Sequence, residues 1–149
     1  MYFISVAAVV VVSGFLLMVG NGNVVWFLDV PSLLVVLLFD SMILISSGLT
    51  KDFNNAFRMA LKNGKEKGLS EIKRAIEAVA LVRKTTLAAG VFSMIFGLIM
   101  AIGQLDDPAM MGPNLAVASL TLLYALAVVL ILLPLESRLK MKLQNLLQD

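Results

Sequence analysis

The sequence predicts an all-α membrane protein with four transmembrane helices and short cytoplasmic amphipathic helices. Hydrophobic residues make up 60% of its 149 residues and charged residues only 15%, and the mean hydropathy is +0.95, which excludes an ordinary water-soluble domain. Three stretches, residues 1–28, 85–105 and 108–135, contain no charged residue. Each exceeds the roughly 20 apolar residues needed to cross a bilayer, and residues 30–50 form a fourth such stretch, interrupted only by Asp40.

The first two helices are expected at residues 2–19 and 31–49, separated by a turn at Gly20-Asn21-Gly22-Asn23. The first apolar stretch has no Lys or Arg before it and no small-x-small cleavage pattern at a suitable distance, so a retained helix is favoured over a signal peptide. The third and fourth helices are expected at residues 82–103 and 113–133. Pro113 is expected to begin the fourth helix, because proline suits the first helical turn.

The positions of the 12 Lys and Arg residues predict the orientation. Nine lie in residues 51–84 and three in residues 138–142, two segments on the same side of a four-helix topology. Cytoplasmic segments collect Lys and Arg, so both termini are expected in the cytoplasm. The two opposite loops carry only Asp29, Asp106 and Asp107 as charged residues.

The basic segment at residues 51–84 is too short for a second globular domain. Apolar residues recur every three or four positions in both of its halves: Phe53, Phe57 and Leu61 in the first, and Leu69, Ile72, Ile76 and Val79 in the second. Two amphipathic helices on or below the membrane are therefore expected, the second capped by Ser70, with a partner-docking surface as the alternative. The chain then divides into helices one and two (1–50), this segment (51–84), helices three and four (85–135) and a cytoplasmic tail (136–149).

The residue types that the chain lacks exclude most enzyme chemistry. The sequence has no Cys and no His, which removes disulfides, thiolate metal sites and the commonest general base. It also contains no Walker loop, nucleophile elbow, hydrolytic carboxylate pair or metal-ligand spacing. We therefore expect no enzyme activity, no cofactor and no metal. The net charge of +2 is attributed to orientation in lipid rather than to nucleic-acid binding.

Asp40 lies about midway along the second helix, where a carboxylate costs roughly 2.5–3.5 kcal/mol. Such residues usually face a polar pathway or a partner, which makes Asp40 a candidate for ion transfer. The structural alternative is that Asp40 is protonated, or hydrogen-bonded to Ser41 or to a Ser or Thr of a neighbouring helix, and fixes helix packing. No Lys, Arg or His lies inside any span as a counter-ion, and both interpretations stay open.

Small and polar residues are sparse in the third and fourth helices. They are Thr85, Thr86, Gly90, Ser93, Gly97 and Gly103 in the third helix and Asn114, Ser119 and Thr121 in the fourth. In lipid these residue types allow close helix approach and hydrogen bonds between helices, while hydroxyl and amide oxygens can also replace part of an ion's hydration shell. In the connecting loop, Asp106-Asp107-Pro108 favours helix capping by Asp107 over attraction of cations to a channel mouth.

Two stretches carry a recognisable family pattern. Residues 27–36, FLDVPSLLVV, contain an Asp-x-Pro-Ser start to the second helix. Residues 97–108, GLIMAIGQLDDP, are followed by MGPNLAVA at 111–118, TLLY at 121–124 and Pro134, and they form the end of the third helix, the loop and the fourth helix. In combination, these spacings resemble the MotA/TolQ/ExbB proton channel family, and its flagellar stator branch in particular.

The resemblance implies a ring-shaped homopentamer in the bacterial inner membrane, whose third and fourth helices surround the transmembrane helices of a dimeric partner. The partner would be a single-span MotB/ExbD-like subunit that supplies the ion-carrying Asp, and proton or sodium flow would drive relative movement. Under this resemblance Thr121 falls on a polar position near the ion pathway, and Pro134 falls on the proline at the cytoplasmic end of the fourth helix. Asp106, Asp107 and Pro108 fall in the extracytoplasmic loop.

The chain departs from the family pattern at several positions. Met94, beside Ser93, stands where many relatives carry a hydroxyl in the third helix, and Leu122 stands at the second of two adjacent threonines. Asp40 stands where small residues are usual. Flagellar relatives also carry a much larger cytoplasmic insertion that engages the rotor, for which residues 51–84 have no room.

These observations lead to a MotA-like subunit of an ion-driven inner-membrane complex. The candidate ion-pathway residues are Asp40, Ser93, Met94, Asn114, Thr121 and Leu122. One alternative is a non-conducting oligomeric scaffold, because apolar Met94 and Leu122 would dehydrate a narrow path. The other is a self-sufficient ion channel that uses Asp40.

Overall fold

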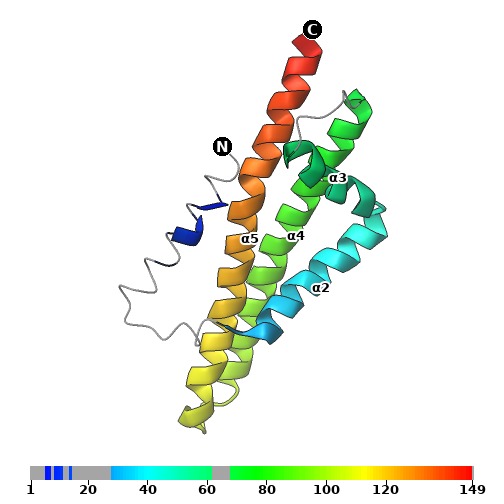
Figure 1. Ribbon diagram of the computed structural model, residues 1–149. Helices are drawn as coiled ribbons and strands as arrows, with labels where there is room; N and C mark the ends of the chain where they lie inside the picture. Colours follow the sequence, from blue (N-terminus) through cyan, green and yellow to red (C-terminus); the bar gives the residue numbers. More distant parts are fainter. Residues whose placement is uncertain (1–5, 8, 12–13, 15–27, 62–67, 149) are drawn as a thin grey trace.

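The computed structural model describes residues 6–7, 9–11, 14, 28–61 and 68–148, and the chain there is all-helical. Its main elements are α2 (Val30–Ser47), α3 (Thr50–Leu61), α4 (Leu69–Ile102) and α5 (Pro108–Gln148), which Figure 1 shows. Among the described residues, α2, α4 and α5 are long and apolar enough to cross a membrane. The prediction of an all-α chain is thus confirmed, and its three long apolar helices are compatible with a membrane protein, while most of the expected first span at 2–19 lies outside the described residues.

Helix α2 begins and ends close to the expected positions 31–49. Asp29 is its N-cap: the Asp29 carboxylate accepts a hydrogen bond of 3.1 Å from the Ser32 N–H, and Pro31 lies in the first turn. The helix ends at Gly48, whose φ of 68° is the left-handed conformation that glycine adopts without strain. The Gly48 N–H then donates to the Ile45 carbonyl at 3.1 Å.

Helix α4 joins two predicted elements into one. The expected amphipathic helix from residue 69 and the expected third span at 82–103 form a single helix of 34 residues, about 50 Å long. Residues 69–89 contain neither Gly nor Pro, so nothing in the backbone ends the helix before the membrane-spanning half. The expectation that Ser70 caps this helix is wrong, because the N-cap is Gly68 and no side chain bonds there.

Helix α5 is longer than expected at both ends. It begins at Pro108 rather than Pro113, after Asp107, whose carboxylate accepts from the Ala109 N–H at 3.2 Å. It also continues through Pro134 into the tail. Each internal proline removes one helical hydrogen bond, but Leu135, directly after Pro134, is fully buried, and this packing holds the helix together there.

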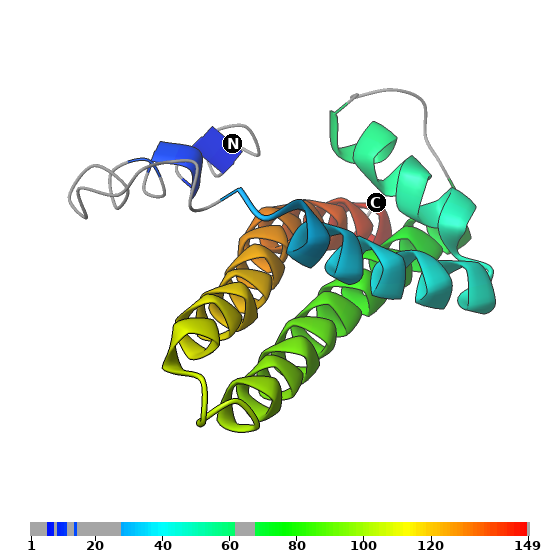
Figure 2. The same ribbon diagram turned by 90° about the horizontal axis from the view of Figure 1, so that it is seen from below.

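Helices α4 and α5 form an antiparallel hairpin (Figure 2), and their backbones approach closely at two glycines of α4. A Cβ added at Gly90 would lie 2.4 Å from the Cβ of Ala125, and one added at Gly97 would lie 2.6 Å from the Cβ of Ala118. Both distances are far below van der Waals contact. Two of the small residues predicted to serve packing or a pore therefore serve close packing of α4 on α5.

At the end of the hairpin away from residues 103–107, α3 packs across α4 and α5; we call this the α3 end. An apolar core forms there from Ala56, Met59 and Ala60 of α3, Ile72, Ala75, Val79 and Val82 of α4, Leu132, Leu135 and Leu139 of α5, and Leu44 of α2. The Arg138 guanidinium donates to the Ala60 carbonyl at 3.1 Å, and Lys142 donates to the Met59 carbonyl. These cations satisfy carbonyls at the end of α3.

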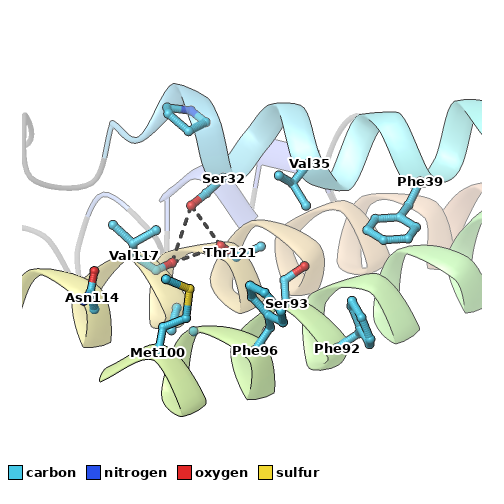
Figure 3. A pocket seen from close by; sticks show the side chains of 13 residues that line it. Ser32, Val35, Phe39, Phe92, Ser93, Phe96, Met100, Asn114, Val117 and Thr121 are labelled. Atoms are coloured by element: carbon cyan, nitrogen blue, oxygen red, sulfur yellow. Dashed lines mark hydrogen bonds between the residues drawn. The ribbon is translucent and has the colours of Figure 1, made fainter. Parts of the chain in front are cut away.

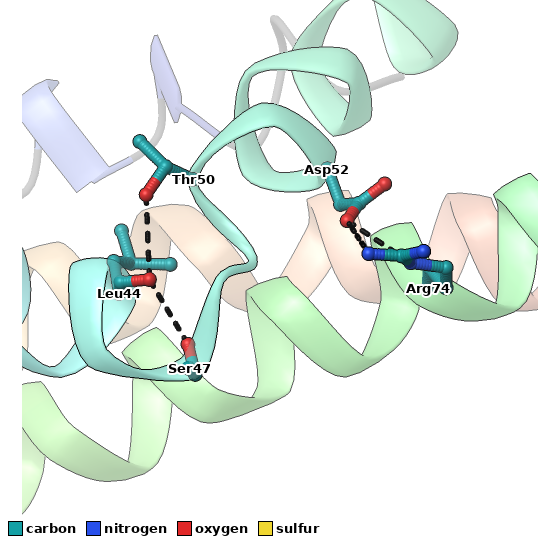
Figure 4. A network of polar contacts seen from close by, with 5 residues as sticks. All are labelled: Leu44, Ser47, Thr50, Asp52 and Arg74. Carbon is teal, nitrogen blue, oxygen red and sulfur yellow. Dashed lines mark hydrogen bonds and ion pairs between the residues drawn. The ribbon is translucent and has the colours of Figure 1, made fainter.

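Polar contacts hold α3 between its neighbours (Figure 4). The Leu44 carbonyl of α2 accepts hydrogen bonds from the Ser47 hydroxyl at 3.0 Å and the Thr50 hydroxyl at 3.3 Å, which fixes the turn into α3. Asp52 of α3 pairs with Arg74 of α4, with an N–O distance of 3.0 Å. The buried face of α3 thus packs against other helices of the chain. Three basic residues of this region, Arg74, Arg138 and Lys142, bind a carboxylate or carbonyl group of α3.

Candidate functional site

A buried polar cluster joins the first turn of α2 to α5, and we call it the Ser32–Thr121 cluster. The Thr121 hydroxyl oxygen lies 2.8 Å from the Ser32 hydroxyl oxygen and 2.9 Å from the Val117 carbonyl. The Ser32 hydroxyl donates to the Asp29 carboxylate, and the Asp29 N–H donates to the Tyr124 hydroxyl at 2.8 Å. Ser32 and Thr121 are both buried. Every hydroxyl in the cluster therefore has a partner, as burial in lipid requires.

This cluster forms part of the wall of a cavity of about 370 Å³ between α2, α4 and α5. Figure 3 shows the polar side chains of Ser32, Ser93, Asn114 and Thr121 around it, with Phe39, Phe92, Phe96, Val35 and Met100 supplying apolar walls. Three of the predicted pathway residues, Ser93, Asn114 and Thr121, thus lie around one space.

Ser32 is a site residue that sequence analysis missed. It was noted only within the Asp-x-Pro-Ser start of α2. The signal that could have found it is its spacing from Asp29, because a serine three residues after an N-cap lies one turn into the helix and beside the capping carboxylate. Its pairing with Thr121, 89 positions later, depends on how α2 and α5 are placed and leaves no mark in the sequence.

The loop between α4 and α5 is also tied to this region. The Asn114 side-chain amide donates to the Gln104 side-chain oxygen, which links the two ends of the loop. Asp106 and Asp107 are exposed, and Asp107 caps α5. Asn114 therefore both lines the cavity and holds the loop, while the two aspartates have no part in the cavity wall.

Met94 and Leu122 do not line the cavity that the described residues form. Leu122 instead packs against Gly90 on the α4–α5 contact, where its Cδ1 lies 3.4 Å from the position of an added Cβ. Met94, beside Ser93, is half-buried on α4. Within one chain, these two apolar side chains are therefore separated from the polar side chains of the cavity.

Asp40 lies two turns along α2 from Ser32 and belongs to a different site. Asp40 Oδ2 lies 2.7 Å from the Thr86 hydroxyl oxygen of α4, a hydrogen-bond distance. Asp40 and Ser41 line a second cavity of about 280 Å³ toward α3, whose other walls are apolar. The predicted pathway residues thus fall into separate groups, and the structure does not connect Asp40 with Thr121.

A buried ion-pair cluster follows Pro134, and sequence analysis missed it. Glu136 is 6% exposed, and its two carboxylate oxygens lie 2.9 Å from Arg83 Nε and 2.7 Å from Lys140 Nζ. Burial raises the pKa of Glu136, but the hydrogen bonds and positive charges of Lys140 and Arg83 outweigh burial and hold it below its ordinary value. The spacing of Glu136 and Lys140, four positions on one helix, was the available signal.

The arrangement can hold water or part of an ion's hydration shell, and the Asp29 carboxylate lies one hydrogen bond away from the cavity, through Ser32. Hydroxyl and amide oxygens line one side of the space, and none of its described lining residues is titratable. The described residues also contain no group of three or more acidic side chains placed to hold a metal ion.

Comparison with known proteins gives one family. No curated protein and no solved structure matches the chain. A family model does match, and it is described as the MotA/TolQ/ExbB proton channel family; it covers residues 41–149, from the second half of α2 through α3, α4 and α5. The matched region includes the hairpin, Ser93, Asn114 and Thr121. The chain therefore belongs to the MotA/TolQ/ExbB proton channel family.

Proposed function

We propose that this chain is a MotA-like subunit of an inner-membrane complex driven by proton- or sodium-motive force. In this proposal several copies, five by resemblance to the flagellar stator branch, form a shell around the transmembrane helices of a single-span MotB/ExbD-like partner. The observation that carries the proposal is the family match over the whole α4–α5 hairpin. The α3 end then faces the cytoplasm, in keeping with the Lys and Arg residues gathered there.

The hairpin has surface available for such an assembly. Within the most apolar 18-residue stretch of α4, and within that of α5, only 22% of the residues are buried inside the chain. Large apolar side chains remain exposed on both helices, among them Phe92, Phe96 and Ile99 of α4 and Leu123, Leu126 and Leu130 of α5. These faces can be covered by lipid, by further copies and by a partner helix, and a shell uses all three.

A partner with a charged group is proposed because none of the described residues that line the cavity is titratable. In the apolar stretches at residues 30–50, 85–105 and 108–135, the only Asp, Glu, Lys or Arg is Asp40, and its carboxylate is buried between α2 and α4. An ion that crosses a bilayer needs a carboxylate or a polar path to replace its water. A partner helix with an Asp would meet this need.

The test is to purify the chain alone and together with a candidate single-span subunit encoded next to it. Native mass spectrometry is expected to give a pentamer, with two partner chains in the joint preparation. Proton uptake into liposomes is expected only for the joint preparation, and an Asp→Asn change in the partner helix is expected to abolish it. A monodisperse monomer in several detergents would contradict the proposal.

Two other candidates give different results in the same experiment. A non-conducting scaffold, suggested by the apolar Met94 and Leu122 in the sequence, predicts the same oligomer with no flux of protons or sodium. A self-sufficient channel predicts flux from the chain alone that Asp40→Asn removes. The process that the complex would power is proposed to differ from ordinary flagellar rotation, because residues 51–84 are too few for the rotor-binding insertion that flagellar relatives carry there.

A further inference from the structure

The attachment of α2 to the rest of the chain depends on one narrow stripe. Its buried residues are Ser32, Val36, Asp40 and Leu44, spaced by four positions and so aligned along one face. Ser32 is satisfied by the Ser32–Thr121 cluster, and Leu44 belongs to the apolar core. Asp40, in the middle of the stripe, is 7% exposed. Whether the Asp40 carboxyl group is charged or neutral therefore affects the stability of the middle of the α2 contact.

The hydrogens around Asp40 can be counted. Thr86 is fully buried, and its hydroxyl oxygen lies 2.7 Å from Asp40 Oδ2 and 2.8 Å from the Val82 carbonyl oxygen. Both are distances of full hydrogen bonds, but a threonine hydroxyl carries one hydrogen. The count balances when Asp40 carries a hydrogen on Oδ2: Asp40 then donates to Thr86, and Thr86 donates to Val82.

The surroundings offer no charge to stabilise a carboxylate. The second oxygen, Asp40 Oδ1, is buried and has no hydrogen-bond partner among the described residues. The cavity beside Asp40 is otherwise lined by apolar side chains of α2, α3, α4 and α5, apart from Ser41, whose hydroxyl donates to the Leu37 carbonyl at 2.7 Å. A buried carboxylate with an unpaired oxygen is far more costly than a buried neutral acid.

Among the described residues, no charged side chain other than Asp40 lines the cavity beside it. On α3, Asp52 pairs with Arg74 of α4. Arg83, three residues before Thr86 on α4, pairs with Glu136 of α5. Neither pair lines the cavity beside Asp40.

We propose that Asp40 and Thr86 form a proton-binding site, separate from the Ser32–Thr121 cluster, and that the bound proton fastens α2 to α4. The proton rests on Asp40 Oδ2 and is shared with the Thr86 hydroxyl. Loss of the proton leaves a negative charge at the centre of the buried stripe, which favours release of α2 from α4. Phe53 and Phe57 of α3, whose ring centroids are 5.2 Å apart, form part of the wall of the cavity beside Asp40.

The test is infrared spectroscopy of the full chain in lipid vesicles at neutral pH, which separates protonated carboxylic acids from carboxylates. The wild-type chain is expected to show one protonated-acid band that Asp40→Asn removes and Asp52→Asn leaves unchanged. Thr86→Val is expected to shift the band to higher frequency, because the acid loses its hydroxyl partner, while Thr86→Ser keeps the band in place.

Two results would overturn the proposal. One is a wild-type spectrum without a protonated-acid band, identical in that region to that of Asp40→Asn, which would assign a carboxylate to Asp40. The other is loss of the band on addition of sodium at constant pH, which would make the site a cation site. Neither measurement depends on ion flux or on a partner, so the site can be refuted while the proposed function stands, and the reverse also holds.

Discussion

The contact between Gly90 and Ala125 can be tested by moving one methyl group from α5 to α4. In Gly90→Ala the new Cβ would lie 2.4 Å from the Ala125 Cβ, whereas carbon atoms in contact lie about 3.5–4.0 Å apart. The helices must therefore separate by more than about 1 Å, and overpacking of this kind costs about 1–3 kcal/mol. Alanine also favours the helix over glycine by about 1 kcal/mol, which partly hides the clash in the single variant.

A double-mutant cycle removes that difficulty, because the helix preferences of the two single changes cancel in the coupling energy. The measurement is reversible unfolding of Gly90→Ala, Ala125→Gly and the double variant in mixed micelles. We expect a favourable coupling of about 1–3 kcal/mol, since the double variant returns the methyl group to an open position. The next contacts of the added Cβ, at 3.4 and 3.6 Å to atoms of Leu122, are tolerable. Additive single effects, within about 0.5 kcal/mol, would refute the close approach of α4 and α5.

Three further outcomes are expected. Glu136→Gln lowers the free energy of unfolding by about 1.5–3 kcal/mol, because Arg83 loses a charged partner. Because the pKa of Glu136 is held low, its contribution is present above the pKa of an unfolded Glu and is lost as pH falls through the lower folded pKa; a pH titration of unfolding should show this acid-side loss in the wild type but not in Glu136→Gln. Thr121→Val removes a hydrogen-bond partner of Ser32, lowers the free energy of unfolding by about 1 kcal/mol and reduces ion uptake by the joint complex. Thr121→Ser is expected to preserve the stability and the uptake. Equal uptake by the two variants would contradict a role of Thr121 in the pathway. Asp29→Ala removes the N-cap of α2 and costs about 0.5–2 kcal/mol, measured by the same unfolding assay, with Asp106→Ala in the exposed loop expected to cost little.

The helical elements follow from local patterns that the sequence displays directly. Long apolar stretches predict α2, α4 and α5, and the capping of α2 by Asp29 and of α5 by Asp107 rests on residues within three positions. The interpretation of Asp40 as hydrogen-bonded to a Ser or Thr of another helix rests only on the fact that a carboxyl group in lipid needs a hydrogen-bond partner. Thr86 of α4 is that partner. These features need no knowledge of how helices are placed.

The lengths of the helices and the partners of their side chains were harder to predict. Pro113 and Pro134 suggested helix boundaries, but α5 continues through both, and at Pro134 the burial of Leu135 outweighs one missing hydrogen bond. The Arg83–Glu136 pair joins residues 53 positions apart, and the Ser32–Thr121 contact joins residues 89 apart. Such contacts depend on the rotation and offset of whole helices, which periodicity within one helix does not determine.

The continuity of α5 has a mechanical consequence. Beyond Pro134 the helix runs to Gln148 without a break, a rod of about 20 Å. A tilt of the membrane half by about ten degrees would displace the far tip by about 3–4 Å, if the rod moves as one. Proline leaves one backbone carbonyl without its usual partner. Any bending of α5 is therefore expected to begin at Pro134, close to the ion pairs of Glu136. A movement of the membrane-spanning half of α5 would then be transmitted to residues 135–148 as a displacement of the helix end, without a separate linker.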